Sequence, residues 1–292
     1  MTSGKQHRVL GSRRDRRGEY PCGLCGVVGR LTKTHVPPQC AGNSSTVGRK
    51  YLVESGGRIT GSGREVRGGL YMFGLCDKCN GLQSRYDDAY GALATALLPY
   101  SRTTNGYDPN HRTKLPETIF RPGAVARSMF IGAHGLTPQF RNLHPDVGVD
   151  LRAETASVTP DGLHLLIAIS RGTSARIAGA THGFFAVGPL SARALKRPEP
   201  VGLDLLAEVY FPPLAWVITD DPELLLLAGW QDVTSWLAYS PGDEHLLSAL
   251  VPELPQVSHP RHTPLLHDWY VEMFADEDAG ITEIVESRKL AR

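Results

Sequence analysis

The sequence predicts an α+β protein in which a small zinc-stapled module precedes a mixed α/β domain of unknown fold. Three observations predict it. Two pairs of closely spaced cysteines lie in the first third of the chain. The hydrophobic spacing becomes helical directly after the second pair, and short helix and strand patterns alternate in the C-terminal half. At 292 residues, with 41% hydrophobic and 21% charged residues, the chain has the size and composition of about two globular domains.

Changes in composition divide the chain into four predicted segments. Residues 1–19 are polar and rich in arginine, which predicts a flexible basic arm. Residues 20–98 hold the cysteine pairs and form the predicted zinc module. Residues 99–120 are rich in Pro, Thr, Asn and Gly and are predicted to be a linker. Residues 121–292 form the mixed α/β domain, whose role no motif identifies.

Charge is distributed unevenly along the chain, although the formal net charge is only +1. Residues 1–120 carry 18 Lys and Arg against 9 Asp and Glu, whereas residues 121–292 carry 13 against 21. A basic front half predicts a polyanionic partner. No apolar run approaches the roughly 18 residues of a membrane span, so no membrane partner is expected.

Four of the five cysteines form two CxxC pairs, Cys22 with Cys25 and Cys76 with Cys79. Four thiolates in two close pairs are the ligand set of a closed, tetrahedral structural zinc site. A redox role requires a thioredoxin-like context, and a zinc deaminase requires an upstream His-x-Glu; the sequence has neither. Cys40 is expected either to replace a ligand or, preferably, to be a small buried hydrophobic residue. This use of cysteine predicts a reducing, cytoplasmic location.

The elements expected in the module are short strands at 27–31, 51–54 and 65–73, followed by an amphipathic helix that begins at the second cysteine pair and ends at Pro99. Two small-residue stretches, Ser55-Gly56-Gly57 and Gly61-Ser62-Gly63, are expected to separate the strands. The order of knuckle, hairpin, knuckle and helix is that of a treble-clef zinc fold. The second half predicts helices at 123–135, 232–237 and 244–250, and strands at 163–170, 183–187 and 208–219.

Three stretches carry a resemblance to a known family: LTKTHVPP at 31–38, VRG at 66–68 and GLCDKCNG at 74–81. In this order, and with the cysteine pairs, they resemble the zinc-containing HNH endonucleases, most closely the recombination endonuclease VII branch. The resemblance covers roughly residues 20–95. It implies a ββα-metal site that hydrolyses phosphodiester bonds with Mg²⁺ or Mn²⁺, beside a structural Zn²⁺.

The resemblance implies roles for two residues. His35 matches the general base, since a neutral imidazole can take a proton from water near pH 7. Asn80 matches the ligand of the catalytic divalent ion. The alternatives are that His35 binds zinc or is simply packed, and that Asn80 is a helix N-cap. Thr34 departs from the family pattern, which has Asp or Glu directly before the base. The family's orienting asparagine is not evident within residues 68–75.

Another carboxylate is needed if the ion is to have an acidic ligand. The candidates are Asp87, Asp88, Glu54 and Glu65. On one helix face Asp87 lies about 10.5 Å from Asn80, which is too far for both to bind one ion directly.

A set of basic side chains is expected to contact phosphates: Arg49, Lys50, Arg58, Arg64, Arg67, Lys78 and Arg85. The sequence therefore predicts a metal-dependent HNH-type endonuclease acting on DNA. Two alternatives stay open. One is a non-catalytic zinc module that binds nucleic acid, and the other is a zinc scaffold for protein interactions.

Overall fold

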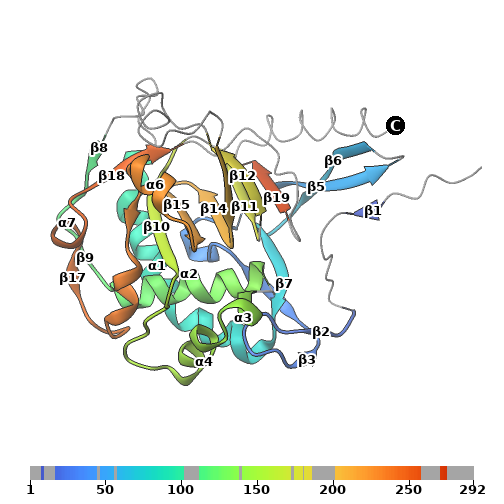
Figure 1. Ribbon diagram of the computed structural model, residues 1–292, viewed down its shortest axis with the longest axis horizontal. Coiled ribbons are helices and arrows are strands. Elements are labelled where there is room, and N and C mark those ends of the chain that lie inside the picture. Colours follow the sequence, from blue (N-terminus) through green and yellow to red (C-terminus); the bar gives the residue numbers. More distant parts are fainter. Residues whose placement is uncertain are drawn as a thin grey trace, which may run out of the picture.

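The computed structural model describes residues 8–9, 17–44, 47–55, 58–101, 112–137, 140–171, 174–179, 181–185, 201–257 and 270–274. These residues form a mixed α/β fold with one large sheet, several two-stranded sheets and a set of helices (Figure 1). The predicted mixture of helix and strand is confirmed. None of the helices in these ranges combines the length and apolar content needed to cross a membrane.

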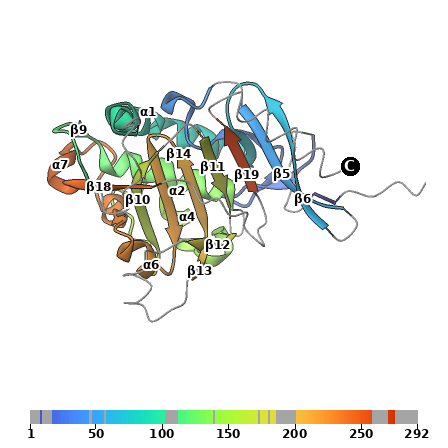
Figure 2. The same cartoon turned by 90° about the horizontal axis from the view of Figure 1, so that it is seen from above.

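The large sheet gathers strands from the whole chain. They are β1 (Arg8–Val9), β5 (Val47–Ser55), β6 (Arg58–Val66), β8 (Arg112–Lys114), β10 (His164–Ser170), β11 (Ser174–Ala178), β14 (Ala207–Phe211), β15 (Leu214–Thr219), β16 (Gln231–Asp232), β18 (Glu253–Val257) and β19 (Tyr270–Phe274). Their order is β1-β5-β19-β11-β14-β15-β10-β18-β8, with β6 on β5 and β16 on β10 (Figure 2). In β10 and β15 nearly every residue is buried, which explains their unbroken apolar sequences.

Four two-stranded sheets accompany the large one in the described part of the chain. They pair β2 (Tyr20–Pro21) with β3 (Val28–Gly29), β4 (Thr32–His35) with β7 (Tyr71–Leu75), β9 (Ile119–Phe120) with β17 (His245–Leu246), and β12 (Thr181–Phe185) with β13 (Val201–Leu205). The β4–β7 pair leads directly into the first helix. This places two antiparallel strands and a helix in sequence around the second cysteine pair.

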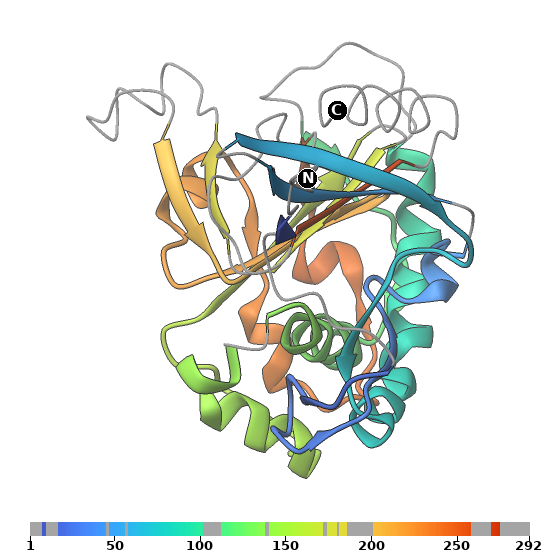
Figure 3. The same ribbon diagram turned by 90° about the vertical axis from the view of Figure 1, so that its right-hand side faces the viewer.

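The helices of the described residues lie on both faces of the large sheet, most of them on one face and the short helix Glu223–Leu227 on the other (Figure 3). They are α1 (Asp77–Ser101), α2 (Pro122–Leu136), α3 (Phe140–Leu143), α4 (Pro145–Ala153), α6 (Glu223–Leu227) and α7 (Leu247–Leu250), with 3-10 turns η1 (Gln39–Ala41) and η2 (Thr234–Ala238). Every residue of α2 is buried, including the polar Arg127, Ser128 and His134. A hydrogen bond of 3.3 Å from the Trp216 indole to the Tyr90 hydroxyl joins β15 to α1.

One hydrophobic core contains both the cysteine region and the C-terminal half. The backbones of the two cysteine-bearing segments approach the backbone of α2 so closely that only glycine fits at two positions, Gly23 and Gly74. A Cβ on Gly23 would lie 1.8 Å from the carbonyl oxygen of His134, and one on Gly74 would lie 2.3 Å from that of Gly135. Both cysteine-bearing segments therefore pack directly on α2. The boundaries predicted at 98 and 120 stay predictions.

Several predicted elements are confirmed, and others differ for physical reasons. The helix at 123–135 corresponds to α2, and the strand at 163–170 to β10. The predicted helix end at Pro99 is wrong: α1 continues to Ser101, whose hydroxyl bonds the Leu98 carbonyl at 2.9 Å. A proline in the last turn removes only its own N–H from the helix. The predicted strand at 65–73 is divided by Gly68 and Gly69, both at positive φ. The expected break at 61–63 is absent, because these residues pair within the β5–β6 ladder.

Candidate metal centre and adjoining cavity

The four cysteines of the two pairs come together in one cluster. Their sulfur atoms lie within 4.8 Å of one another, and the sulfurs of Cys25 and Cys76 are 3.8 Å apart. A tetrahedral zinc ion with bonds of about 2.3 Å has ligand–ligand edges of about 3.8 Å. The donor set and its spacing therefore fit a zinc ion, and the predicted metal-binding cluster is confirmed as a site that can hold one.

Local backbone geometry explains how the sequence brings these sulfurs together. The Gly26 N–H donates to the Cys22 carbonyl at 2.9 Å, and the Cys22 N–H donates to the Val27 carbonyl at 3.0 Å, which closes a tight knuckle. Gly26 has a φ of +76°, which favours glycine. The backbone N–H of Cys76 donates to the Cys22 sulfur at 3.3 Å. The thiol of Cys79, by donating to Cys22, lowers the pKa of Cys22 to about 4.

Cys40 lies outside the cluster. Its side chain is exposed, and its sulfur donates a hydrogen bond of 3.1 Å to the backbone oxygen of Asp87. The expectation of a buried hydrophobic cysteine is therefore wrong. The position is fixed by packing of η1 against α1, where a Cβ on Gly91 would lie 2.7 Å from the Cys40 sulfur.

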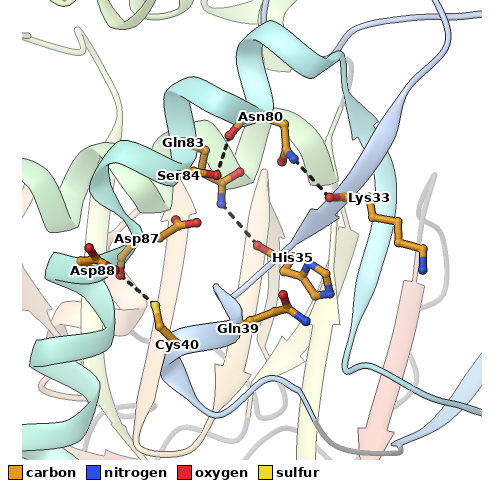
Figure 4. Close-up of a pocket in the computed structure, with 9 residues that line it drawn as sticks. All are labelled: Lys33, His35, Gln39, Cys40, Asn80, Gln83, Ser84, Asp87 and Asp88. Carbon is orange, nitrogen blue, oxygen red and sulfur yellow. Dashed lines mark hydrogen bonds between the residues drawn. The ribbon is translucent and has the colours of Figure 1, made fainter.

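A polar cavity of about 410 Å³ lies between β4, η1 and α1 (Figure 4). Nine residues line it: Lys33, His35, Gln39, Cys40, Asn80, Gln83, Ser84, Asp87 and Asp88. His35 and Asn80, the two residues singled out as base and ion ligand, thus share one cavity. This cavity is the candidate site.

His35 ends β4 and is held by two backbone interactions. Its Nε2 lies 3.0 Å from the Gly68 carbonyl oxygen, which can only accept, so Nε2 carries the proton and donates it. Its own carbonyl accepts a bond of 3.3 Å from the Gln83 side chain of α1. Burial and the nearby Lys33 charge lower the pKa of His35 below its usual 6.5, although the Gly68 bond opposes this. The described metal-binding cluster comprises only the four cysteines, so the zinc-ligand alternative for His35 finds no support.

Asn80 lies in the first turn of α1. The Nδ2 of its side chain donates to the Lys33 carbonyl at 3.3 Å. The side-chain Oδ1 is the atom that can accept a hydrogen bond or bind a cation. Its backbone N–H bonds to the Cys76 carbonyl at 2.9 Å, and α1 begins three residues earlier at Asp77. The N-cap alternative for Asn80 is therefore wrong, because the residue is already inside the helix.

Thr34 faces away from the cavity. It is fully buried, and a Cβ on Gly135 of α2 would lie 3.3 Å from its methyl carbon. Its hydroxyl oxygen has no hydrogen-bond partner within the described ranges. The residue before His35 therefore contributes nothing to the cavity.

Two of the four candidate carboxylates do reach the cavity. Asp87 and Asp88 line it from α1, about two helical turns after Asn80. The Ser128 hydroxyl of α2 donates to Asp87 Oδ1 at 3.1 Å. Burial raises the pKa of Asp87 to about 6, with a smaller contribution from Asp88, while the Ser128 bond opposes the rise. Glu54 and Glu65 lie on β5 and β6, and their side chains are outside the described part.

Sequence reasoning missed Asn43. This buried side chain donates to the Pro37 carbonyl at 2.6 Å and to the Leu70 carbonyl at 2.8 Å, and its Oδ1 accepts from the Leu70 N–H at 2.6 Å. It thus ties the loop after His35 to the segment that carries Gly68. The sequence pattern places the orienting asparagine within residues 68–75, whereas Asn43 precedes them. Its sequence context, between Gly42 and Ser44, is typical of a turn and gives no further signal.

The predicted basic residues differ in their surroundings. Lys33 is not among the predicted residues, and its ammonium group lies 4.4 Å from the centre of the Tyr71 ring. Arg67 and Lys78 are exposed, and exposed Arg85 forms a 2.6 Å ion pair with Glu154. Arg49, Lys50, Arg58 and Arg64 belong to β5 and β6, and their side chains lie outside the described residues.

No protein-family model, curated protein or solved structure matches this chain. An assignment of function must therefore come from the chemistry of the site.

Proposed function

We propose that the protein is a metal-dependent endonuclease of the HNH type that hydrolyses phosphodiester bonds in DNA. One observation carries the proposal. An imidazole with one unprotonated nitrogen and an amide from the first turn of a helix share a polar cavity beside a cluster of four cysteines. In this proposal β4, β7 and α1 are the ββα unit of a treble-clef module, and a structural zinc ion fixes its two knuckles.

His35 is the proposed general base. A base needs a free lone pair and a pKa that leaves it neutral at the working pH. The bond from Nε2 to the Gly68 carbonyl leaves the lone pair on Nδ1. The lowered pKa of His35 favours the neutral ring near pH 7. These features support removal of a proton from the attacking water by Nδ1.

Asn80 is the proposed ligand of a Mg²⁺ or Mn²⁺ ion. Both ions prefer oxygen ligands, and Asn80 Oδ1 is such an atom on the wall of the cavity. When bound, the ion would neutralise charge that develops on the phosphate. Asn80 also joins α1 to β4 through Lys33, so the amide and the imidazole keep their relative position.

Basic residues near the cavity are the proposed DNA contacts. Lys33 lines the cavity, and Arg67 lies directly before Gly68, whose carbonyl holds His35. Such side chains position the phosphate backbone without reading sequence. DNA binding is therefore expected to weaken steeply as salt increases.

Nicking of supercoiled plasmid by the full-length protein, with Mg²⁺ or Mn²⁺ added, tests the proposal. His35→Ala is expected to lower the rate by about 10²–10⁴-fold, the usual contribution of a general base. His245→Ala is a matched control, since this half-buried histidine of β17 lies outside the cavity. Zinc content should be equal in all three proteins.

Equal cleavage by the wild type and His35→Ala would remove the proposed base. Salt-sensitive DNA binding without cleavage under any divalent ion would favour the non-catalytic nucleic-acid-binding module. The absence of DNA binding even at low salt would favour the protein-interaction scaffold.

A further inference from the structure

Asp87 differs from the other carboxylate of the cavity in how it is held. Asp88 is exposed, whereas Asp87 is partly buried and its Oδ1 accepts the Ser128 hydroxyl hydrogen at 3.1 Å. Ser128 is itself buried in α2. The Cys40 thiol bonds the Asp87 backbone oxygen from η1. Asp87 is thus fixed by two other elements, and its second carboxyl oxygen carries no hydrogen bond within the described residues.

The Asp87 carboxyl points into the cavity. Figure 4 shows it directed from α1 toward the space between α1 and β4, with His35 across from it on β4. An in-line displacement at phosphorus has the attacking water on one side and the leaving oxygen on the other. A cavity with one proton-transfer group on each side matches that geometry.

We infer that Asp87 is the general acid of the proposed hydrolysis and donates its proton to the leaving oxygen of the phosphodiester. This inference rests on the proposed function. The His35 Nδ1 takes a proton from water as the water oxygen bonds to phosphorus. The bond from phosphorus to the leaving oxygen breaks, and that oxygen receives the Asp87 proton. The products are an alcohol and a phosphomonoester, and exchange with solvent returns both side chains to their starting states.

The surroundings of Asp87 support a carboxyl group that retains its proton. Burial raises its pKa to about 6, and Asp88 on the same helix acts in the same direction. The Ser128 hydroxyl opposes the rise, and Cys40 faces it as a neutral thiol whose own pKa is raised. Lys33 and His35 face the cavity from β4. A carboxyl that titrates near pH 6 can serve as an acid in weakly acidic solution.

An alternative role for Asp87 is to bind the same divalent ion as Asn80. The distance between the two residues along α1 argues against this role. Seven residues of α-helix separate the two along the axis by about 10.5 Å, whereas ligands of one Mg²⁺ lie about 2.1 Å from it. The two residues are therefore better placed to act on different atoms of one phosphodiester than to bind one ion.

Comparison of two substrates tests the inference. A nucleotide alkoxide must be protonated as it leaves, whereas p-nitrophenolate leaves without a proton. We expect Asp87→Asn to lower DNA cleavage by about 10²-fold or more, while hydrolysis of bis(p-nitrophenyl) phosphate changes by less than about threefold. His35→Gln should lower both rates.

In the pH–rate profile on DNA, Asp87→Asn should remove the alkaline limb. Asp150→Asn, which removes a half-buried carboxylate of α4 outside the cavity, is the matched control and should retain both rates.

The outcomes separate the two proposals. Equal losses on both substrates, or an unchanged alkaline limb, would overturn the role of Asp87 as an acid. Recovery of Asp87→Asn by excess Mn²⁺ would assign the carboxylate to the ion instead. If the wild type cleaves neither substrate with any divalent ion, the proposed function and this inference both fail. If it cleaves DNA and Asp87→Asn cleaves it equally well, only this inference fails.

Discussion

Thr34 and His35 are consecutive residues of β4, and their side chains face opposite sides of the strand. Thr34 is fully buried against α2, whereas His35 lines the polar cavity. This is the normal alternation of a strand, and the pairing of Thr34 with Met72 and of His35 with Tyr71 fixes it. A side chain at position 34 therefore cannot reach an ion in the cavity unless β4 changes its register.

Substitutions of Thr34 test whether this position has lost an acidic ion ligand or belongs to the hydrophobic core. Thr34→Val should raise the free energy of unfolding by about 1 kcal/mol, because a buried hydroxyl that has no hydrogen-bond partner among the described residues is replaced by a methyl group. Thr34→Asp should lower it by about 2–5 kcal/mol, since an unpaired carboxylate enters the core. Urea denaturation measures both changes. A well-folded Thr34→Asp protein with faster DNA cleavage would contradict the orientation of this residue.

The sequence predicts those features of the fold and the site that depend on residues close together along the chain. It does not predict the features that depend on pairing between distant residues. The cysteine pairs were predictable because a zinc shell requires close spacing within each pair. The helix after Cys79 was predictable from the three- and four-residue recurrence of its apolar side chains. The side on which Thr34 lies was not, because it depends on pairing with Met72, far along the chain. The role of Asn43 was hidden for the same reason, since its partner Leu70 lies 27 residues away.

Removal of metal should destabilise more of the protein than the knuckles. The cysteine-bearing segments share the core with α2, and Gly23 and Gly74 lie against its backbone. We expect a strong zinc chelator to lower the thermal midpoint of the whole chain in one transition. Differential scanning calorimetry with and without chelator measures this. Cys25→Ser should mimic the chelator, and Cys40→Ser should not. An unchanged midpoint after loss of zinc would show that the cluster is not a structural site.

Asn43 should be required for the position of His35 rather than for metal binding. Its three hydrogen bonds to Pro37 and Leu70 are buried, so Asn43→Ala leaves backbone groups without partners. The expected loss in the free energy of unfolding is about 2–4 kcal/mol. Zinc content should be retained, while any DNA cleavage should fall. Ser44→Ala, at the exposed neighbouring position, is the control. Retention of full stability by Asn43→Ala would show that these bonds contribute little.

Asp87→Asn should stabilise the protein in a pH-dependent way. The pKa of Asp87 is raised from 3.8 to about 6, so the folded protein holds this proton after the unfolded chain has released it. Stability is therefore lost as the pH rises from about 4 to 6, and the loss is constant above that range. Asparagine has nearly the same shape, can accept the Ser128 bond, and does not ionise.

The expected gain is about 1–3 kcal/mol in the free energy of unfolding at pH 7.5, and close to zero at pH 4, where both states of the wild type are protonated. Denaturation at a series of pH values measures it, with Asp88→Asn as the matched exposed control. Because zinc loss at low pH affects both variants equally, the difference between them isolates Asp87. A gain that is the same at pH 4 and pH 7.5 would come from packing and not from ionisation. A loss of stability at pH 7.5 would mean that the folded state favours the charged carboxylate, and Asp87 could then not retain a proton for the leaving oxygen.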